Sequence, residues 1–269
     1  MLRTLAMGAT AAALICACAA PVGHASQSAT LDASLTPERL GHETTFGFGF
    51  QISSPRGQVP SPVTAVGLSY PKNLGVAISG LGIEHCLLPM LVARGTSACS
   101  TGTRMGFGSA TVEIPVGPVI VREAARIEVF RAPQQEGHLA MIFNTEGAAP
   151  VQAEIALPGV LQTAQEPFGG RVAIELPLVA SLPEASDVSI VDLHVAIGPA
   201  HLIYHELLHG KTLYYRPEGI KIPKHCPRGG FQFAATFEFL DGSRTSAQAV
   251  VPCPRSSTRA PRRRAVKHR

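Results

Sequence analysis

The sequence predicts an all-β fold, an antiparallel β-sandwich or jelly-roll-like arrangement that follows a cleaved signal peptide. Short apolar runs alternate with Gly and Pro turns at intervals of roughly 8 to 15 residues, a spacing typical of short strands. The 26 glycines and 22 prolines are spread along the chain, and no long stretch keeps a helical apolar stripe with caps at both ends. Many strands without interleaved helices favour packed antiparallel sheets.

The clearest strand pair lies near the C-terminus. Every second residue of 231–239 is Phe or Ala, so one face of an extended strand would be apolar. The Asp-Gly pair at 241–242 predicts a hairpin turn, and a return strand is predicted over 244–251. A second alternating strand is predicted at 44–52, with Phe at every second position from 46 to 50.

The rest of the chain contains weaker strand patterns. Further strands are predicted near residues 62–69, 108–115, 118–130, 138–144, 151–157, 170–177 and 187–197. Residues 87–93 fit either a short helix or an irregular loop. The β-rich mature part, 26–253, fits one large domain or two smaller units of about 30–116 and 117–253.

The first 25 residues predict a signal peptide. Arg3 precedes an apolar run from Leu5 to Ala20, and small residues end the segment at 23–25. Cleavage after Ala25 would leave Ser26 as the new N-terminus. The apolar run is too short to be preferred as a spanning helix, and no later stretch offers about 18 uninterrupted apolar residues. No transmembrane segment is therefore predicted.

The predicted signal peptide indicates an exported protein, either extracellular or at the cell surface. An alternative is lipid anchoring, because residues 15–18, Ile-Cys-Ala-Cys, loosely resemble a bacterial lipobox in which Cys18 would be acylated. Cys16 is an unusual occupant of its place in that motif.

The four cysteines of the mature part predict two disulfides. An even number of cysteines in an exported chain favours disulfides over free thiols. Four cysteines permit three connectivities, and the two local pairs close the smaller loops. Zinc binding is disfavoured because no two of them have the C-x2-C spacing. The expected disulfide residues are Cys86 with Cys99 and Cys226 with Cys253.

The formal net charge of +4 averages two different regions. Of the 23 basic residues, one lies in the leader and seven lie in the tail, which leaves 15 against 19 acids in residues 26–253. The tail, 254–269, is expected to be disordered and to bind anionic envelope polymers or lipids through charge, not specific nucleic acid. A merely solubilising tail is the alternative. The basic residues are Arg255, Arg259, Arg262, Arg263, Arg264, Lys267 and Arg269.

An HExxH motif occupies His205-Glu206-Leu207-Leu208-His209. On a helix, the two His would face one way and bind zinc, while the Glu would polarise the metal-bound water. The longer metzincin pattern fails because Gly210 directly follows the second His, and Thr212 and Tyr215 stand where that pattern needs Gly and His. The competing interpretation is two strands, 201–208 and 212–216, joined at 209–211.

Other catalytic patterns are absent. The chain has no G-x-S-x-G elbow, no P-loop and no G-x-G-x-x-G opening a βαβ unit. Glu113, Glu123 and Glu128 are candidates for paired glycosidase carboxylates, but their alternation in strands favours a solvated face. The absence of Trp argues against an aromatic sugar-binding platform. No cofactor and no catalytic or metal-ligating residue is assigned.

The segment Cys226-Pro-Arg-Gly-Gly-Phe-Gln-Phe-Ala-Ala-Thr-Phe-Glu-Phe-Leu-Asp-Gly, with the closing Val-Pro-Cys-Pro at 251–254, resembles a family of uncharacterised secreted proteins from soil actinobacteria. The segments at 59–63, 70–75 and 214–217 are also similar, so the resemblance covers most of residues 30–254. It implies a β-rich fold, paired cysteines and a strand-turn-strand region around the HExxH motif. It implies no activity, ligand or catalytic residue.

These observations predict an exported cell-envelope or extracellular protein with a non-enzymatic binding or structural role. The alternative is a zinc-dependent hydrolase that uses His205, Glu206 and His209.

Overall fold

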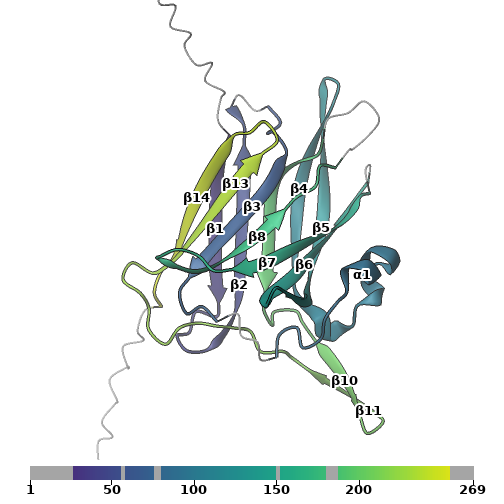
Figure 1. Ribbon diagram of the computed structural model, residues 1–269, viewed down its shortest axis with the longest axis vertical. Helices are drawn as coiled ribbons and strands as arrows, with labels where there is room; N and C mark the ends of the chain where they lie inside the picture. Colours follow the sequence, from purple (N-terminus) through teal and green to yellow (C-terminus); the bar gives the residue numbers. More distant parts are fainter. Residues whose placement is uncertain (1–26, 56–57, 76–79, 150–151, 180–186, 255–269) are drawn as a thin grey trace, which may run out of the picture.

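The computed structural model describes residues 27–55, 58–75, 80–149, 152–179 and 187–254, and it confirms the all-β antiparallel class (Figure 1). The described residues also contain the helix α1 (Leu88–Arg94) and the 3-10 turns η2 (Thr96–Ala98) and η3 (Thr101–Thr103). The strands are β1 (Ser28–Thr36), β2 (Glu43–Ser53), β3 (Val63–Pro71), β4 (Arg104–Val116), β5 (Val119–Gln135), β6 (His138–Gly147), β7 (Glu154–Gln162), β8 (Phe168–Glu175), β9 (Ser189–Ile197), β10 (Tyr204–Leu208), β11 (Lys211–Tyr215), β12 (Ile220–Lys221), β13 (Phe231–Phe239) and β14 (Arg244–Val251).

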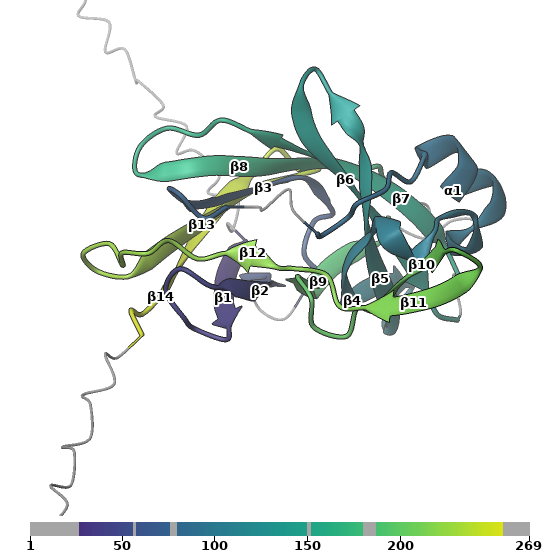
Figure 2. The same ribbon diagram turned by 90° about the horizontal axis from the view of Figure 1, so that it is seen from below.

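Twelve strands form one antiparallel sheet that nearly closes into a barrel. The order is β1-β2-β9-β4-β5-β6-β7-β8-β3-β13-β14, and β12 pairs with β2 beside this path. The end strands β1 and β14 lie against each other, and Figure 2 shows the sheet curling round on itself. The packed layers predicted from the sequence are thus opposite walls of one curled sheet, because strand twist accumulates over so many strands.

Strands from both halves of the chain alternate in this sheet. The strand β9 lies between β2 and β4, and β3 lies between β8 and β13. Residues 30–116 and 117–253 therefore contribute strands to one shared sheet. The strand order does not divide them into two smaller units. Such long-range pairings are invisible to local sequence patterns.

The predicted strands are present with shifted ends. The segment expected at 151–157 is β7, which starts at Glu154, and the one expected at 108–115 is β4, which starts at Arg104. The segment 87–93, for which helix and loop remained open, is the helix α1. Its first turn contains a proline, which suits that position because the first helical N–H groups have no partner within the helix.

Phenylalanines of β2 and β13 fill one side of the barrel. The rings of Phe46 and Phe233 stack with centroids 4.9 Å apart, and Phe50 meets Phe237 edge-on, also at 4.9 Å. All four side chains are buried. Each such burial stabilises the fold by about 1.5–3 kcal/mol relative to exposure, so this cluster is a large part of the core.

Both predicted disulfides are present. The bond between Cys226 and Cys253 joins Cα atoms 5.8 Å apart and links the chain entering β13 to the end of β14. The bond between Cys86 and Cys99, with Cα atoms 5.2 Å apart, encloses α1. It packs with Leu91 of α1 in a second, smaller core on the outer face of β5 and β6.

The predicted leader and the basic tail lie outside the described residues, apart from Pro254, so both remain predictions. Within the part of the chain that the structure describes, no helix is long and apolar enough to cross a lipid bilayer.

Candidate functional site

The principal candidate site is an apolar cavity inside the barrel. The lining includes Phe46, Phe48 and Phe50 of β2 and Phe143 of β6, and most of its other side chains are aliphatic. The space left between them has a volume of about 160 Å³. Its walls come from most strands of the sheet, and representative lining residues are Val66, Leu68, Ile127, Phe143, Leu157 and Val195.

Strand alternation explains why this lining is almost wholly apolar. Successive residues of a strand point to opposite faces, so one set of alternating positions faces the interior. In β5 the interior positions include Ala125 and Ile127, which line the cavity. The residues before them, Ala124 and Arg126, are exposed on the other face. The small pair Ala110 and Ala125, directly opposite in β4 and β5, leaves room in this wall.

Polar side chains are few among the described residues that line the cavity. They are Tyr70 of β3, Glu123 of β5 and Thr145 of β6. Burial raises the pKa of the Tyr70 phenol above its ordinary value of 10.0, so this group is neutral at physiological pH. Glu123 is only 4% exposed and is the one acidic side chain in the described lining.

The three carboxylates considered for glycosidase chemistry lie in separate environments, and all three are buried, not solvated. Glu123 faces the cavity, as does its cross-strand neighbour Val112. Glu113 follows Val112 and so points to the other face, where Arg122 lies 2.7 Å from it. Glu128 is five residues from Glu123 and also lies on the outer face. The expectation of a solvated face was wrong because paired or interior positions shield these groups.

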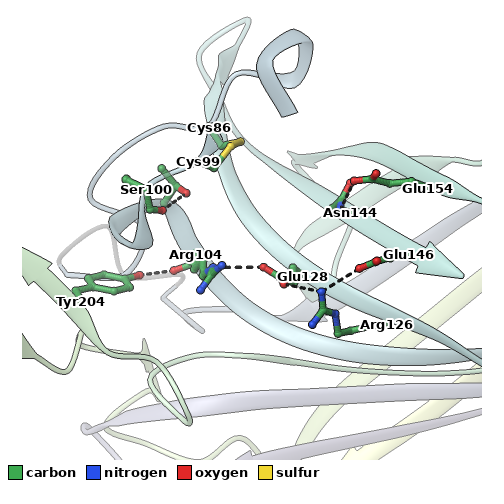
Figure 3. Close-up of polar contacts among 11 residues, drawn as sticks. Cys86, Cys99, Ser100, Arg104, Arg126, Glu128, Asn144, Glu146, Glu154 and Tyr204 are labelled. Carbon is green, nitrogen blue, oxygen red and sulfur yellow. Dashed lines mark hydrogen bonds and ion pairs between the residues drawn. A yellow bond between two sulfur atoms is a disulfide. The ribbon is translucent and has the colours of Figure 1, made fainter. Parts of the chain in front are cut away.

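A row of ion pairs crosses the outer face of β4, β5 and β6 (Figure 3). Glu128 lies between two cations, with Arg104 at 3.3 Å and Arg126 at 3.5 Å, and Arg126 also lies 2.9 Å from Glu146. The exposed Arg126–Glu146 pair contributes about 0–1 kcal/mol, whereas the two cations beside buried Glu128 offset the cost of removing its charge from water. The cations that flank Glu128 therefore give this row a structural explanation.

The HExxH motif lies in a hairpin and not in a helix. His205 and Glu206 belong to β10, which pairs with β11, and His209 lies in the turn with a positive φ of 49°. Consecutive residues of a strand point to opposite faces, so the helical geometry in which both His and the Glu act on one metal is not formed. The described residues contain no group of three or more His, Cys, Asp or Glu side chains that could hold a metal ion. The strand-turn-strand interpretation of this region is confirmed.

The base of this hairpin is anchored, whereas its tip is exposed. The hydroxyl of buried Tyr204 accepts a hydrogen bond from the Gly82 amide at 2.9 Å and donates one to the Arg104 carbonyl. Thr101 and His205 share a further hydrogen bond of 3.0 Å between Oγ1 and Nδ1. Beyond these contacts the hairpin projects from the barrel (Figure 1).

Comparisons with protein-family models, with curated proteins and with solved structures found no match to this chain. The resemblance to secreted actinobacterial proteins therefore remains a prediction. Sequence reasoning did not find the cavity, because its walls are ordinary core residues from strands far apart in the chain. Glu123 was singled out for another chemistry, and only its position inside the barrel distinguishes it from the other acids.

Proposed function

We propose that the protein is exported and acts as a non-enzymatic binding protein that holds a small apolar ligand inside its barrel. The observation that carries this proposal is the interior cavity of about 160 Å³ with an almost wholly apolar lining. Binding sites for small molecules are concave and mostly apolar, with a few polar groups that fix orientation. This cavity has the same composition.

The size of the cavity indicates the size of the ligand. An apolar protein cavity of about 150 Å³ stays dry and accepts benzene. The cavity described here is similar in volume, so it suits a six-membered ring or the end of an alkyl chain. Filling it with apolar atoms would restore dispersion contacts that the lining side chains lack.

Thermal unfolding in the presence of toluene tests this proposal. A ligand that binds only the folded state stabilises it by about 2.7 kcal/mol at a concentration of 100 times its Kd. Toluene is therefore expected to raise the Tm of the wild-type protein. The substitution Ala125→Phe places a ring in the cavity wall and is expected to abolish this rise.

A matched control lies one residue away. Ala124 is exposed on the outer face of β5, so Ala124→Phe makes the same chemical change outside the cavity and should keep the toluene response. Unfolding of both variants without toluene establishes that each is folded. A toluene response that survives in Ala125→Phe, or that is missing in the wild type, would argue against ligand binding in the barrel.

Two features support the proposed location outside the cytoplasm. The residues 1–25 have the composition of a signal peptide, and the two disulfides are compatible with an oxidising compartment. Mass spectrometry of protein secreted by an actinobacterial host checks cleavage. A mature N-terminus at Ser26 is expected, whereas a lipid on Cys18 would establish the anchored alternative.

The basic tail is proposed to hold the protein at anionic envelope polymers or lipids. Its seven Arg and Lys residues face no acid within 254–269, and each is worth about 1 kcal/mol near an anionic surface. Removing residues 255–269 should therefore reduce co-sedimentation with vesicles that contain anionic lipid, and added salt should reduce it for the full chain. Equal, salt-insensitive sedimentation of both forms would leave the tail with no binding role.

A further inference from the structure

We propose that Glu123 makes the cavity selective for ligands that carry a hydrogen-bond donor, namely an apolar chain with a hydroxyl or amine group, over fatty acids. This inference rests on the proposed function and names the class of ligand for the same cavity. The carboxyl of Glu123 is only 4% exposed and lies among aliphatic and aromatic side chains of the cavity wall.

The position of the carboxyl is set by a glycine on the neighbouring strand. Gly147 ends β6 and pairs with Ala125 of β5, two residues from Glu123. A Cβ atom placed on Gly147 would lie 2.5 Å from Oε1 of Glu123, closer than real Cβ contacts. The carboxyl therefore lies over the Gly147 backbone, in space that any larger residue would occupy. Thr145, two residues before Gly147, also lines the cavity.

The cavity thus has a polar end and an apolar middle. Glu123 and Thr145 lie toward the end of β6, whereas Tyr70 lies beside Gly170 at the start of β8. The start of β8 pairs with the end of β7, and the end of β7 pairs with the start of β6. The Tyr70 phenol and the Glu123 carboxyl are therefore at opposite ends of the interior wall, and only one of them is acidic.

The chemistry of a carboxyl group decides which ligand head fits beside it. A carboxyl group has two oxygens that can each accept more than one hydrogen bond, so Glu123 can accept from a ligand donor in addition to its contacts within the protein. A hydroxyl or ammonium group supplies such a donor. A fatty-acid carboxylate supplies no donor, and burying its own charge in an apolar cavity is costly.

Titration calorimetry at pH 7 with ligands that differ only in their head tests the inference. The probes are 1-octanol, octylamine and octanoate, and toluene serves as the probe without a head group. We expect octanol and octylamine to bind the wild-type protein about tenfold more tightly than octanoate, the factor that about 1.4 kcal/mol of hydrogen bonding supplies. The preference should fall to about twofold or less in Glu123→Leu, with toluene affinity retained.

Two further variants separate a role in binding from a role in folding. Glu123→Gln keeps the shape and an acceptor oxygen, so it should keep the affinity for octanol and lose the preference for octylamine over octanoate. Tyr70→Phe removes the polar group at the other end of the cavity and should leave the head-group preference unchanged. Thermal unfolding of each variant without ligand shows that it is folded.

The contrary outcomes are distinguishable. Octanoate binding as tightly as octanol, or an octanol preference that persists in Glu123→Leu, would overturn the role of Glu123 while toluene binding still supports the cavity as a ligand site. Failure of toluene and of all three octyl compounds to bind would overturn the proposed function, and the inference with it.

Discussion

The two hairpins β13–β14 and β10–β11 show how differently apolar residues are used in this molecule. In β13 every second residue is buried, and the Phe side chains pack against β2 across the barrel. In β10 only Tyr204 is buried, while Leu207 is 72% exposed, and in β11 Tyr214 is 73% exposed. A hairpin is buried only where its apolar residues share one face and the fold places another surface against that face.

The same difference explains why the HExxH motif lies in an exposed hairpin. The cross-strand pairs of β10 and β11 put Leu207 with Thr212 on one face and Leu208 with Lys211 on the other. Apolar residues thus occur on both faces of this hairpin. A core hairpin has them on one face only, and the residues of the HExxH motif here do not lie in a helix. The five predictions below test how far the two hairpins differ, from the largest expected effect to the smallest.

Removing an aromatic ring should distinguish the hairpins most strongly. Phe233→Ala in β13 is expected to lower the free energy of unfolding by about 3–5 kcal/mol, because it leaves a cavity in a packed core. Tyr214→Ala in β11 is expected to change it by no more than about 0.5 kcal/mol, because the ring is mostly exposed. Urea denaturation measures both values. Similar losses in the two variants would contradict the contrast.

The disulfide at the open end of β13–β14 is expected to have the next largest effect. Replacing Cys226 and Cys253 together by Ser should lower the free energy of unfolding by about 3 kcal/mol, since the bond restricts a loop with a sequence separation of 27. Chemical denaturation of this variant, with and without reductant, measures the loss. Non-reducing peptide mapping of the wild type should give only the Cys86–Cys99 and Cys226–Cys253 peptides. A crossed peptide between the two pairs would refute the pairing.

The anchor of the projecting hairpin should have a moderate effect. Tyr204→Phe removes a buried hydroxyl and leaves the Gly82 amide and the Arg104 carbonyl without that partner, so stability should fall by about 1–2 kcal/mol. Tyr214→Phe makes the same change at an exposed ring of the same hairpin and should have no measurable effect. Equal values for the two would show that the hairpin base is no better anchored than its tip.

Alkaline pH gives a second measurement of the same anchor. Burial raises the pKa of Tyr204 above its ordinary value of 10.0, an effect that the Gly82 hydrogen bond partly opposes. The folded state therefore retains the phenol proton longer than the unfolded state, so this stabilisation is complete below pH 10 and is lost as the pH rises above it. Tyr204→Phe should show a smaller decline in stability above pH 10 than the wild type. An identical decline would place the titrating group elsewhere.

The histidines of the motif should have the smallest effect. His205→Ala combined with His209→Ala is expected to change stability by no more than about 1 kcal/mol, because both side chains are exposed. Purified mature protein is expected to contain no stoichiometric zinc. Stoichiometric zinc that is lost from the double variant would instead support the hydrolase alternative and contradict a non-enzymatic role.

The sequence by itself determined the elements whose signals are local. Strict alternation over 231–239 and an Asp-Gly turn specified the β13–β14 hairpin, and the short loops of the two local cysteine pairs favoured the connectivity that is present. In contrast, β1 was not predicted. Its apolar residues alternate with polar ones, but two of the four are alanines and only Leu31 and Leu35 are buried, so its place in the fold depends on β2 and β14.

Only the tertiary structure decided what the interior contains. Closing a sheet brings together strands whose order in space differs from their order in the chain. The cavity exists because the phenylalanine and aliphatic side chains of these strands do not fill the space between them. For the same reason Glu123 faces an apolar interior while Glu113 and Glu128 face cations outside. Alternation shows that neighbouring residues of a strand lie on opposite faces, but which face becomes the interior depends on contacts between distant segments.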